Sequence, residues 1–172
     1  MERLRNKDIL YFAAEQSMLR WMKRNSISVT TADLYAAADL KLDIQDMRLS
    51  DASYDVVIAN HVLEHVDDYK KALLEIWRIL KPSGFLICSF PMDSQIEFVD
   101  EEEGEMSTEA RIQRFGQHDH KRVFGMRAEE LLREAGYTVE VIDGETYPKE
   151  ILPVIGPADY DMNRLFVCTK ME

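Results

Sequence analysis

The segment YDVVIAN at residues 54–60 is apolar without alternation, and an amphipathic stretch follows it closely. A strand that is apolar at consecutive positions is covered on both faces, which is typical of a parallel sheet packed between helices. The next stretch, DDYKKALLEIWRILKPSG, spaces its apolar residues along one helical stripe that ends at Pro82 and Gly84. This succession predicts an α/β fold.

The same alternation of strand and helix runs along most of the chain. Helical spacing is found again in EQSMLRWMKRN, and in MRAEELLREAGY with Gly136 as a cap. Further strands are predicted at residues 8–15, 26–34, 38–44, 85–91, 138–143 and 164–170, the last two as an edge pair. Together these elements predict a doubly wound, mostly parallel sheet with helices on both faces and right-handed crossovers.

Composition restricts the partners that this fold can have. With 172 residues, of which 46% are hydrophobic, the chain can bury the core of one domain. Its 21 Lys and Arg against 32 Asp and Glu give a net charge of -11, which argues against a nucleic-acid partner. No apolar run has the length of a membrane span or of a signal peptide, so we expect a cytoplasmic protein. Cys88 and Cys168 lie in strand-like runs and are expected to be reduced core thiols.

Polar residues follow the predicted parallel strands where each strand ends. In doubly wound folds, ligands bind outside the carboxyl ends of the strands. One such residue is explained by helix capping or by an ordinary loop, but a series of them predicts a shared pocket. The series consists of Glu15, Asp33, Asp43, Asn60, His61 and Asp93.

Asp33 has the position of a ribose ligand, because it ends the second strand about 20 residues after the turn that follows the first. A carboxylate there can accept hydrogen bonds from two vicinal hydroxyl groups. Asp43 ends the next strand outward, where a carboxylate can accept from an adenine amino group while Ile44 covers the ring. The spacing therefore favours a nucleoside ligand.

Two adjoining motifs, YDVVIANHVLEHV and ALLEIWRILKPSGFLICSFP, resemble the fourth strand, helix and fifth strand of class I, Rossmann-like S-adenosylmethionine-dependent methyltransferases. The resemblance is strongest over residues 54–91 and is closest to the branch that acts on small molecules such as quinone precursors. It implies a seven-stranded sheet in the order 3-2-1-4-5-7-6 with an antiparallel last strand. It also implies S-adenosylmethionine as cofactor, S-adenosylhomocysteine as product, and a small-molecule acceptor with an O, N or C nucleophile.

The resemblance assigns the cofactor to residues at the ends of the predicted strands. It implies that Asp33 binds the ribose, that Asp43 and Ile44 bind the adenine, and that Asn60 and His61 contact the methionine portion. The full set of cofactor-binding candidates is Ala13, Ala14, Glu15, Asp33, Leu34, Asp43, Ile44, Asn60 and His61.

The turn after the first strand departs from the family pattern. Where the family has Gly-x-Gly-x-Gly, this chain has YFAAEQS, so Ala13 and Ala14 are the smallest residues available and Glu15 adds a negative charge. The chain also begins close to its first strand, so the N-terminal helices that often cover the pocket in this family are expected to be missing. We therefore expect a pocket that is open or closed by a second subunit of a homodimer.

The segment 92–125 is long and polar, and we expect it to be an acceptor-binding lid within the single domain of residues 1–172. It contains His118 and His120, which together with His61 and His65 are predicted to lie on one side of the sheet. All four histidines are candidate catalytic bases.

The histidines also have simpler interpretations. His118 and His120 can belong to an exposed polar loop, and although a His-x-His pair can bind metal, no third ligand of suitable spacing is evident, so no metal site is predicted. His61 and His65 share a face if a helix has begun there. Alternatively, Glu64 and His65 merely cap a helix that begins at 66 or 67.

Two other functional classes compete with a methyltransferase. The missing glycines and short N-terminus also suit a catalytically silent relative that acts as a binding or regulatory subunit. A nicotinamide-dependent enzyme is disfavoured, because the glycine fingerprint that binds pyrophosphate is absent.

Overall fold

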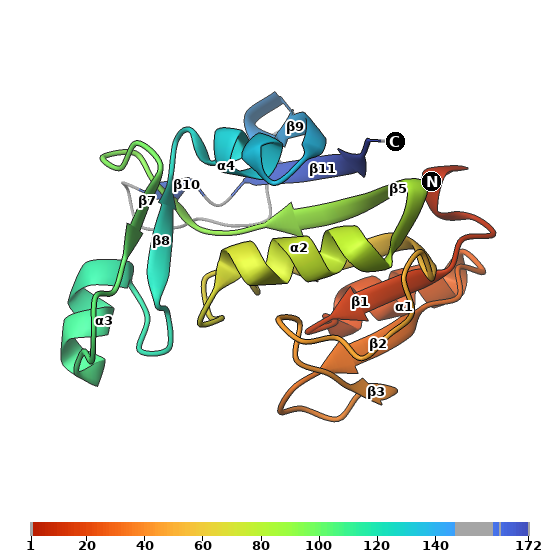
Figure 1. Ribbon diagram of the computed structural model, residues 1–172, viewed down its shortest axis with the longest axis horizontal. Coiled ribbons are helices and arrows are strands. Elements are labelled where there is room, and N and C mark those ends of the chain that lie inside the picture. The colour runs from red at the N-terminus through yellow and green to blue at the C-terminus, as the bar shows by residue number, and fades with distance from the viewer. Residues whose placement is uncertain (1, 147–159, 162, 172) are drawn as a thin grey trace.

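The computed structural model describes residues 2–146, 160–161 and 163–171. Its largest element is a seven-stranded sheet in the order β3-β2-β1-β4-β5-β11-β9 (Figure 1). Its strands are β1 (Ile9–Phe12), β2 (Thr30–Asp33), β3 (Leu40–Lys41), β4 (Tyr54–Asn60), β5 (Leu80–Ser89), β9 (Tyr137–Asp143) and β11 (Arg164–Lys170). Because β9 and β11 are the sixth and seventh strands of this sheet along the chain, the predicted order 3-2-1-4-5-7-6 is confirmed.

Strand pairing is parallel through the first five strands of the sheet. β11 is antiparallel to both β5 and β9, as expected for the last strand. The register places Leu10 of β1 opposite Thr30 of β2 and Val57 of β4. The carboxyl ends of β1, β2, β4 and β5 therefore meet at one edge of the sheet, which is where the predicted site residues lie.

Helices cover both faces of the sheet, because consecutive residues of its central strands are apolar and point to opposite sides. Tyr11 of β1 packs with Met22 of α1 on one face. Leu10 belongs to the buried cluster on the other face, which also includes Leu73 of α2 and Leu132 of α4. The helices are α1 (Gln16–Arg24), α2 (Tyr69–Ile79), α3 (Thr108–Phe115) and α4 (Ala128–Glu134), with 3-10 turns at Glu2–Leu4 and Gly144–Thr146.

The end of α2 differs from the prediction. The helix ends at Ile79, and Pro82 and Gly84 already belong to β5. A side chain at position 84 would place its Cβ 2.8 Å from the carbonyl oxygen of Lys81, which explains why glycine is needed there. The predicted cap of α4 is confirmed, since Gly136 has a φ of +95°.

Residues 92–125 fold into part of a second sheet, of order β10-β6-β8-β7. The sequence predicts no regular element in this segment, because strands of two to four residues are too short to show a periodic pattern. Figure 1 places this small sheet beyond the carboxyl end of β5, with α3 at its outer side. Its strands are β6 (Met92–Asp93), β7 (Val99–Glu101), β8 (Arg122–Gly125) and β10 (Tyr160–Asp161).

Within the described residues, no helix has both the length and the apolar character that crossing a bilayer requires. Cys88 and Cys168 are free and buried, as predicted. A hydrogen bond with Cys168 and burial both raise the pKa of Cys88. Both thiols therefore belong to the core and are not reactive groups.

Candidate active site

A cavity of about 710 Å³ lies at the carboxyl ends of the first four strands. Its walls come from β1, from the segments that follow β2, β3 and β4, and from residues 111–121 next to the small sheet. The predicted site residues that line it are Ala13, Asp33, Leu34, Asp43, Ile44, His61 and His65. The structure thus brings the predicted ribose, adenine and methionine positions into one cavity.

Asp33 is already held by its own turn. Its Oδ1 accepts hydrogen bonds from the backbone N–H groups of Tyr35 and Ala36, each at 2.7 Å. Among the described residues, no group donates to its Oδ2. One oxygen therefore fixes the loop after β2 while the other stays available to a ligand.

Asp43 has a similar arrangement after β3. Its Oδ1 accepts from the backbone N–H of Gln45 at 2.8 Å and from the Gln45 side-chain amide at 3.1 Å. The Gln45 Oε1 in turn accepts the N–H of Asp68 at 2.7 Å, at the beginning of α2. Ile44 is buried beside this pair. The loop that would face the adenine is thus tied to the helix that follows β4.

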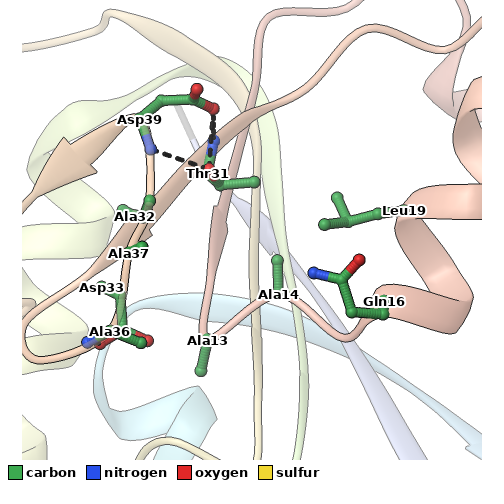
Figure 2. Close-up of a pocket in the computed structure, with 11 residues that line it drawn as sticks. Ala13, Ala14, Gln16, Leu19, Thr31, Ala32, Asp33, Ala36, Ala37 and Asp39 are labelled. Carbon is green, nitrogen blue, oxygen red and sulfur yellow. Dashed lines mark hydrogen bonds between the residues drawn. The ribbon is translucent and has the colours of Figure 1, made fainter.

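A second cavity of about 610 Å³ adjoins the first around the end of β2 and shares Ala13 and Asp33 with it (Figure 2). Ala14 lines this second cavity and not the first. Asp39 accepts from the backbone N–H and the hydroxyl of Thr31, at 2.9 and 2.7 Å. These hydrogen bonds lower the pKa of Asp39. Asp39 is thus engaged locally and is not a wall of the larger cavity.

Ala13 occupies the tight turn after β1 with a φ of +47°, a left-handed conformation that favours glycine. The family pattern places glycines in this turn. Ala13 therefore differs from that pattern in having a side chain, while its backbone has a conformation that glycine favours. The backbone N–H of Ala13 donates to the Ala32 carbonyl at 3.0 Å, which ties the turn to β2.

Replacing Ala13 by glycine is expected to stabilise the protein by about 0.5–1 kcal/mol, because the strain of the left-handed conformation is removed. Ala14→Gly is the matched control, since Ala14 has no positive φ and should lose about 0.5–1 kcal/mol. Urea unfolding of both variants measures the difference. Equal destabilisation by the two substitutions would show that the turn at Ala13 is not strained.

The chain after β4 does not enter a helix at once. α2 begins only at Tyr69, and the residues before it form turns in which the His65 N–H donates to the Val62 carbonyl at 3.1 Å. The prediction that His61 and His65 share a helical face is therefore wrong. The alternative, in which Glu64 and His65 cap the helix, is also wrong, because the residue before Tyr69 provides the cap.

That cap is Asp68, whose carboxylate accepts the backbone N–H of Lys71 at 2.9 Å. A side-chain acceptor at this position satisfies one of the free N–H groups of the first helical turn. Residues 61–67 therefore precede the helix and contribute to the cavity wall.

His61 lies in the cavity wall with a φ of +50°, and its N–H donates to the Ser89 carbonyl at 2.8 Å. Its Nδ1 is 3.3 Å from Oε1 of Glu64, a carboxylate that is 0% exposed. This neighbour raises the pKa of His61 although burial opposes the shift, and Glu15 adds a smaller effect in the same direction. A strained backbone next to a buried carboxylate is typical of a functional position.

His65 also faces the cavity, and its Nδ1 is 3.3 Å from Oδ2 of Asp119. Burial raises the pKa of Asp119, but a hydrogen bond from Gln117 and the nearby His65 outweigh it, so the net shift is downward. The two side chains connect the segment after β4 to the segment before β8.

The remaining candidates lie outside the larger cavity. Asn60 ends β4, and its buried Oδ1 has no hydrogen-bond partner. Glu15 is exposed at the start of α1 and makes no capping hydrogen bond with its side chain. His118 is exposed, whereas His120 is buried with its Nδ1 2.9 Å from the Phe115 carbonyl oxygen.

Three residues of the 92–125 segment line the cavity without having been predicted: Arg111, Asp119 and Lys121. Arg111 pairs with Glu102 at 2.7 Å, and Lys121 pairs with Asp67. No motif marks such residues, because they reach the cavity only through the folding of the small sheet.

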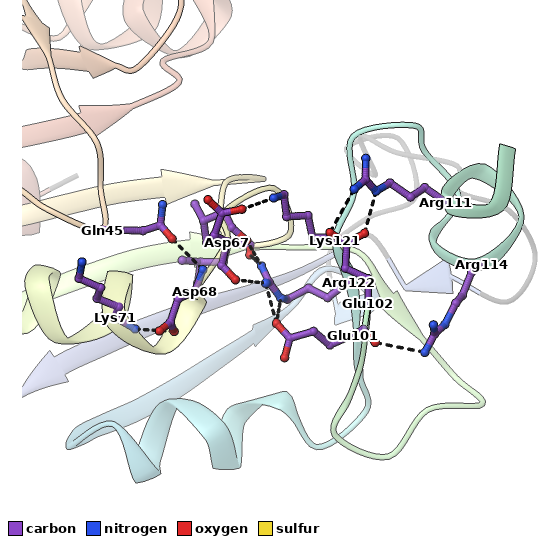
Figure 3. Close-up of polar contacts among 12 residues, drawn as sticks. Gln45, Asp67, Asp68, Lys71, Glu101, Glu102, Arg111, Arg114, Lys121 and Arg122 are labelled. Atoms are coloured by element: carbon purple, nitrogen blue, oxygen red, sulfur yellow. Dashed lines mark hydrogen bonds and ion pairs between the residues drawn. The ribbon is translucent and has the colours of Figure 1, made fainter. Parts of the chain in front are cut away.

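Arg122 of β8 holds this small sheet to the segment after β4 (Figure 3). Its side chain is 1% exposed and donates to the carbonyl groups of Leu63, Val66 and Asp67 at 2.6–2.9 Å. Its Nε also donates to the carboxylate of Glu101 at 2.8 Å. One buried guanidinium thus fixes the segment that presents His61 and His65 to the cavity.

Comparison with known proteins adds family information to this geometry. Residues 5–88 match the family model described as a methyltransferase domain. The demethylmenaquinone methyltransferase of Listeria monocytogenes is 37% identical over 60 residues, which are 35% of this chain and 25% of that protein. The chain spans only 2–25% of the length of the curated relatives it matches, the others being large synthases.

Solved structures match along nearly the whole chain. An S-adenosylmethionine-dependent methyltransferase from Mesorhizobium loti has a TM-score of 0.65 and 14% identity, covering 99% of this chain and 94% of that one. The 1,6-didemethyltoxoflavin-N1-methyltransferase of Burkholderia thailandensis, crystallised with bound 1,6-didemethyltoxoflavin and S-adenosylhomocysteine, has a TM-score of 0.62 and 16% identity, covering 96% of this chain and 72% of that one. Residues 5–88 therefore resemble a methyltransferase domain, and the chain has the fold of class I, Rossmann-like S-adenosylmethionine-dependent methyltransferases.

Proposed function

We propose that this protein transfers the methyl group of S-adenosylmethionine to a small-molecule acceptor through an O, N or C nucleophile. The observation that carries the proposal is the single cavity that contains Asp33, Asp43 and His61. Its volume of about 710 Å³ is in the range of small-molecule sites. The Burkholderia methyltransferase with a similar fold binds both a small heterocycle and the cofactor product, which supports this class of acceptor.

In this proposal the cofactor lies along the carboxyl ends of the first four strands. The free Oδ2 of Asp33 accepts from the ribose hydroxyls, and Asp43 with Ile44 holds the adenine. Ala13 and His61 flank the methionine portion, where the backbone of the turn approaches most closely. The segment 92–125 acts as the acceptor-binding lid, which is supported by the contribution of Arg111 and Lys121 to the cavity wall.

The chemical step is a displacement at the methyl carbon. The acceptor atom forms a bond to this carbon while the carbon–sulfur bond breaks and its electron pair stays on sulfur, giving S-adenosylhomocysteine. Positioning the two substrates in line supplies most of the rate, and a base contributes when the acceptor must lose a proton. We assign the base to His61, because its Nδ1 faces Glu64 and its ring lines the cavity. His118 and His120 lie outside the cavity wall and have no part in this step.

A thermal-unfolding panel separates this proposal from its rivals. At about 100 times its dissociation constant, a ligand stabilises the folded state by roughly 2.7 kcal/mol, which raises the melting temperature by about 5–10 °C for a chain of this size. We expect this shift with S-adenosylhomocysteine and none with NAD at the same concentration. A shift with NAD alone would point to a nicotinamide-dependent enzyme.

A further inference from the structure

A cluster of possible metal ligands, two of them buried, adjoins the cavity through His65. Glu64 and His65 follow β4, and His120 precedes β8, and one ligand atom from each lies within 4.8 Å of the other two. Glu64 is 0% exposed, and neither of its carboxylate oxygens accepts a hydrogen bond from any residue that the structure describes. The Nδ1 of His61 lies 3.3 Å from Oε1, which makes an ion pair when that ring is protonated. A buried carboxylate without a hydrogen bond is costly, so a cation at this point would compensate it.

The neighbours of both imidazole rings favour Nε2 as the coordinating atom. The Nδ1 of His120 is 2.9 Å from the carbonyl oxygen of Phe115, which can only accept, so this nitrogen carries the proton. The Nδ1 of His65 lies 3.3 Å from the carboxylate of Asp119, and this negative charge favours a proton on the same nitrogen. Each ring therefore keeps its lone pair on Nε2. Histidines that bind metal usually donate their other nitrogen to a carbonyl or a carboxylate in this way.

The two segments that carry the cluster are joined by backbone contacts. The N–H of Lys121 donates to the carbonyl of Glu64 at 2.9 Å. The neighbouring Arg122 donates to the carbonyls of Leu63 and Val66, on either side of the Glu64–His65 pair. The His65 and His120 rings are in edge contact, with centroids 4.8 Å apart. The positions of the three side chains are thus set by the fold.

We propose that Glu64, His65 and His120 bind a divalent first-row transition ion, with Zn²⁺ as the representative. Two imidazoles and one carboxylate are a donor set that zinc and iron accept, whereas Mg²⁺ and Ca²⁺ prefer oxygen ligands. Ligand atoms at about 2.0–2.2 Å from the ion would lie closer together than the three side chains do now. The three side chains therefore move toward one another when the ion binds. The site touches the cavity through His65 and does not depend on the proposed methyl transfer.

The test uses untagged, metal-free protein titrated with Zn²⁺ in a calorimeter. We expect one equivalent to bind with a dissociation constant of micromolar or lower, and excess Mg²⁺ not to compete. His120→Gln should weaken binding at least 100-fold. His118→Gln is the matched control, because His118 is exposed and outside the cluster, and it should leave the affinity unchanged.

Glu64→Gln distinguishes a ligand from a structural residue. Without metal, this variant should melt at the same temperature as the native protein or higher, because it removes a buried carboxylate that accepts no hydrogen bond from the described residues and has only the 3.3 Å contact with His61. The rise in melting temperature that Zn²⁺ gives to the native protein should be lost. The proposal is overturned if Zn²⁺ at 100-fold excess over protein does not bind, if His118→Gln and His120→Gln weaken binding equally, or if Glu64→Gln binds as tightly as the native chain.

Discussion

Asp33→Asn is expected to weaken S-adenosylhomocysteine binding by about 10–100-fold while the protein stays folded. The asparagine Oδ1 can still accept the N–H groups of Tyr35 and Ala36, so the turn after β2 is kept. Its amide nitrogen replaces the free Oδ2 and cannot accept from ribose hydroxyls. Hydrogen bonds to a charged acceptor contribute about 1.5–3 kcal/mol each, and 1.4 kcal/mol is a factor of ten in affinity.

Asp39→Asn is the matched control for this substitution. Asp39 lies in the adjoining cavity and bonds to Thr31, so the same loss of charge close to the site should leave the affinity nearly unchanged. Calorimetric titration of the native protein and both variants gives the comparison, and their melting temperatures report on folding. Equal affinities for native protein and Asp33→Asn would exclude Asp33 as the ribose ligand.

Arg122→Met is expected to lower the free energy of unfolding by about 3–5 kcal/mol. The substitution removes a guanidinium that is 1% exposed and leaves the carbonyl groups of Leu63, Val66 and Asp67 without their donor. Each buried acceptor left unpaired costs about 1–3 kcal/mol, and breaking a buried charged pair costs about 3–5 kcal/mol in total. Denaturant unfolding measures the loss.

Arg127→Met provides the comparison. Arg127 also pairs with two carboxylates, those of Glu97 and Glu130, but its side chain is 48% exposed. Exposed ion pairs contribute at most about 1 kcal/mol. If Arg122→Met costs no more than Arg127→Met, the small sheet is not held by the buried guanidinium. If Arg122→Met does not fold, Arg122→Lys, which keeps one charge but fewer donors, should give an intermediate loss.

The main sheet could be predicted from sequence because its signals are local. The strand at Tyr54–Asn60 is apolar at consecutive positions, and its bounds agree with the prediction. Polar residues at the strand ends led to Asp33 and Asp43 because parallel strands bring their carboxyl ends together. The fold and the cavity at the strand ends therefore follow from patterns that span only a few residues each.

The polar wall of the site could not be predicted in the same way. Asp119 and Lys121 reach the cavity through strands of two to four residues, which leave no periodic signal. The ring contact of His120 with His65 joins segments that are distant in sequence, so the His-x-His pattern gives no sign of it. His118 is exposed and His120 is buried, and this difference becomes evident only once the small sheet has folded.

The central claim is that the cavity at the strand ends binds a nucleoside that carries an amino acid. Calorimetric titration of S-adenosylhomocysteine into the native protein tests it most directly. We predict one site per chain with a micromolar dissociation constant. The absence of binding at millimolar ligand would contradict the claim and, with it, the assignment of methyl transfer.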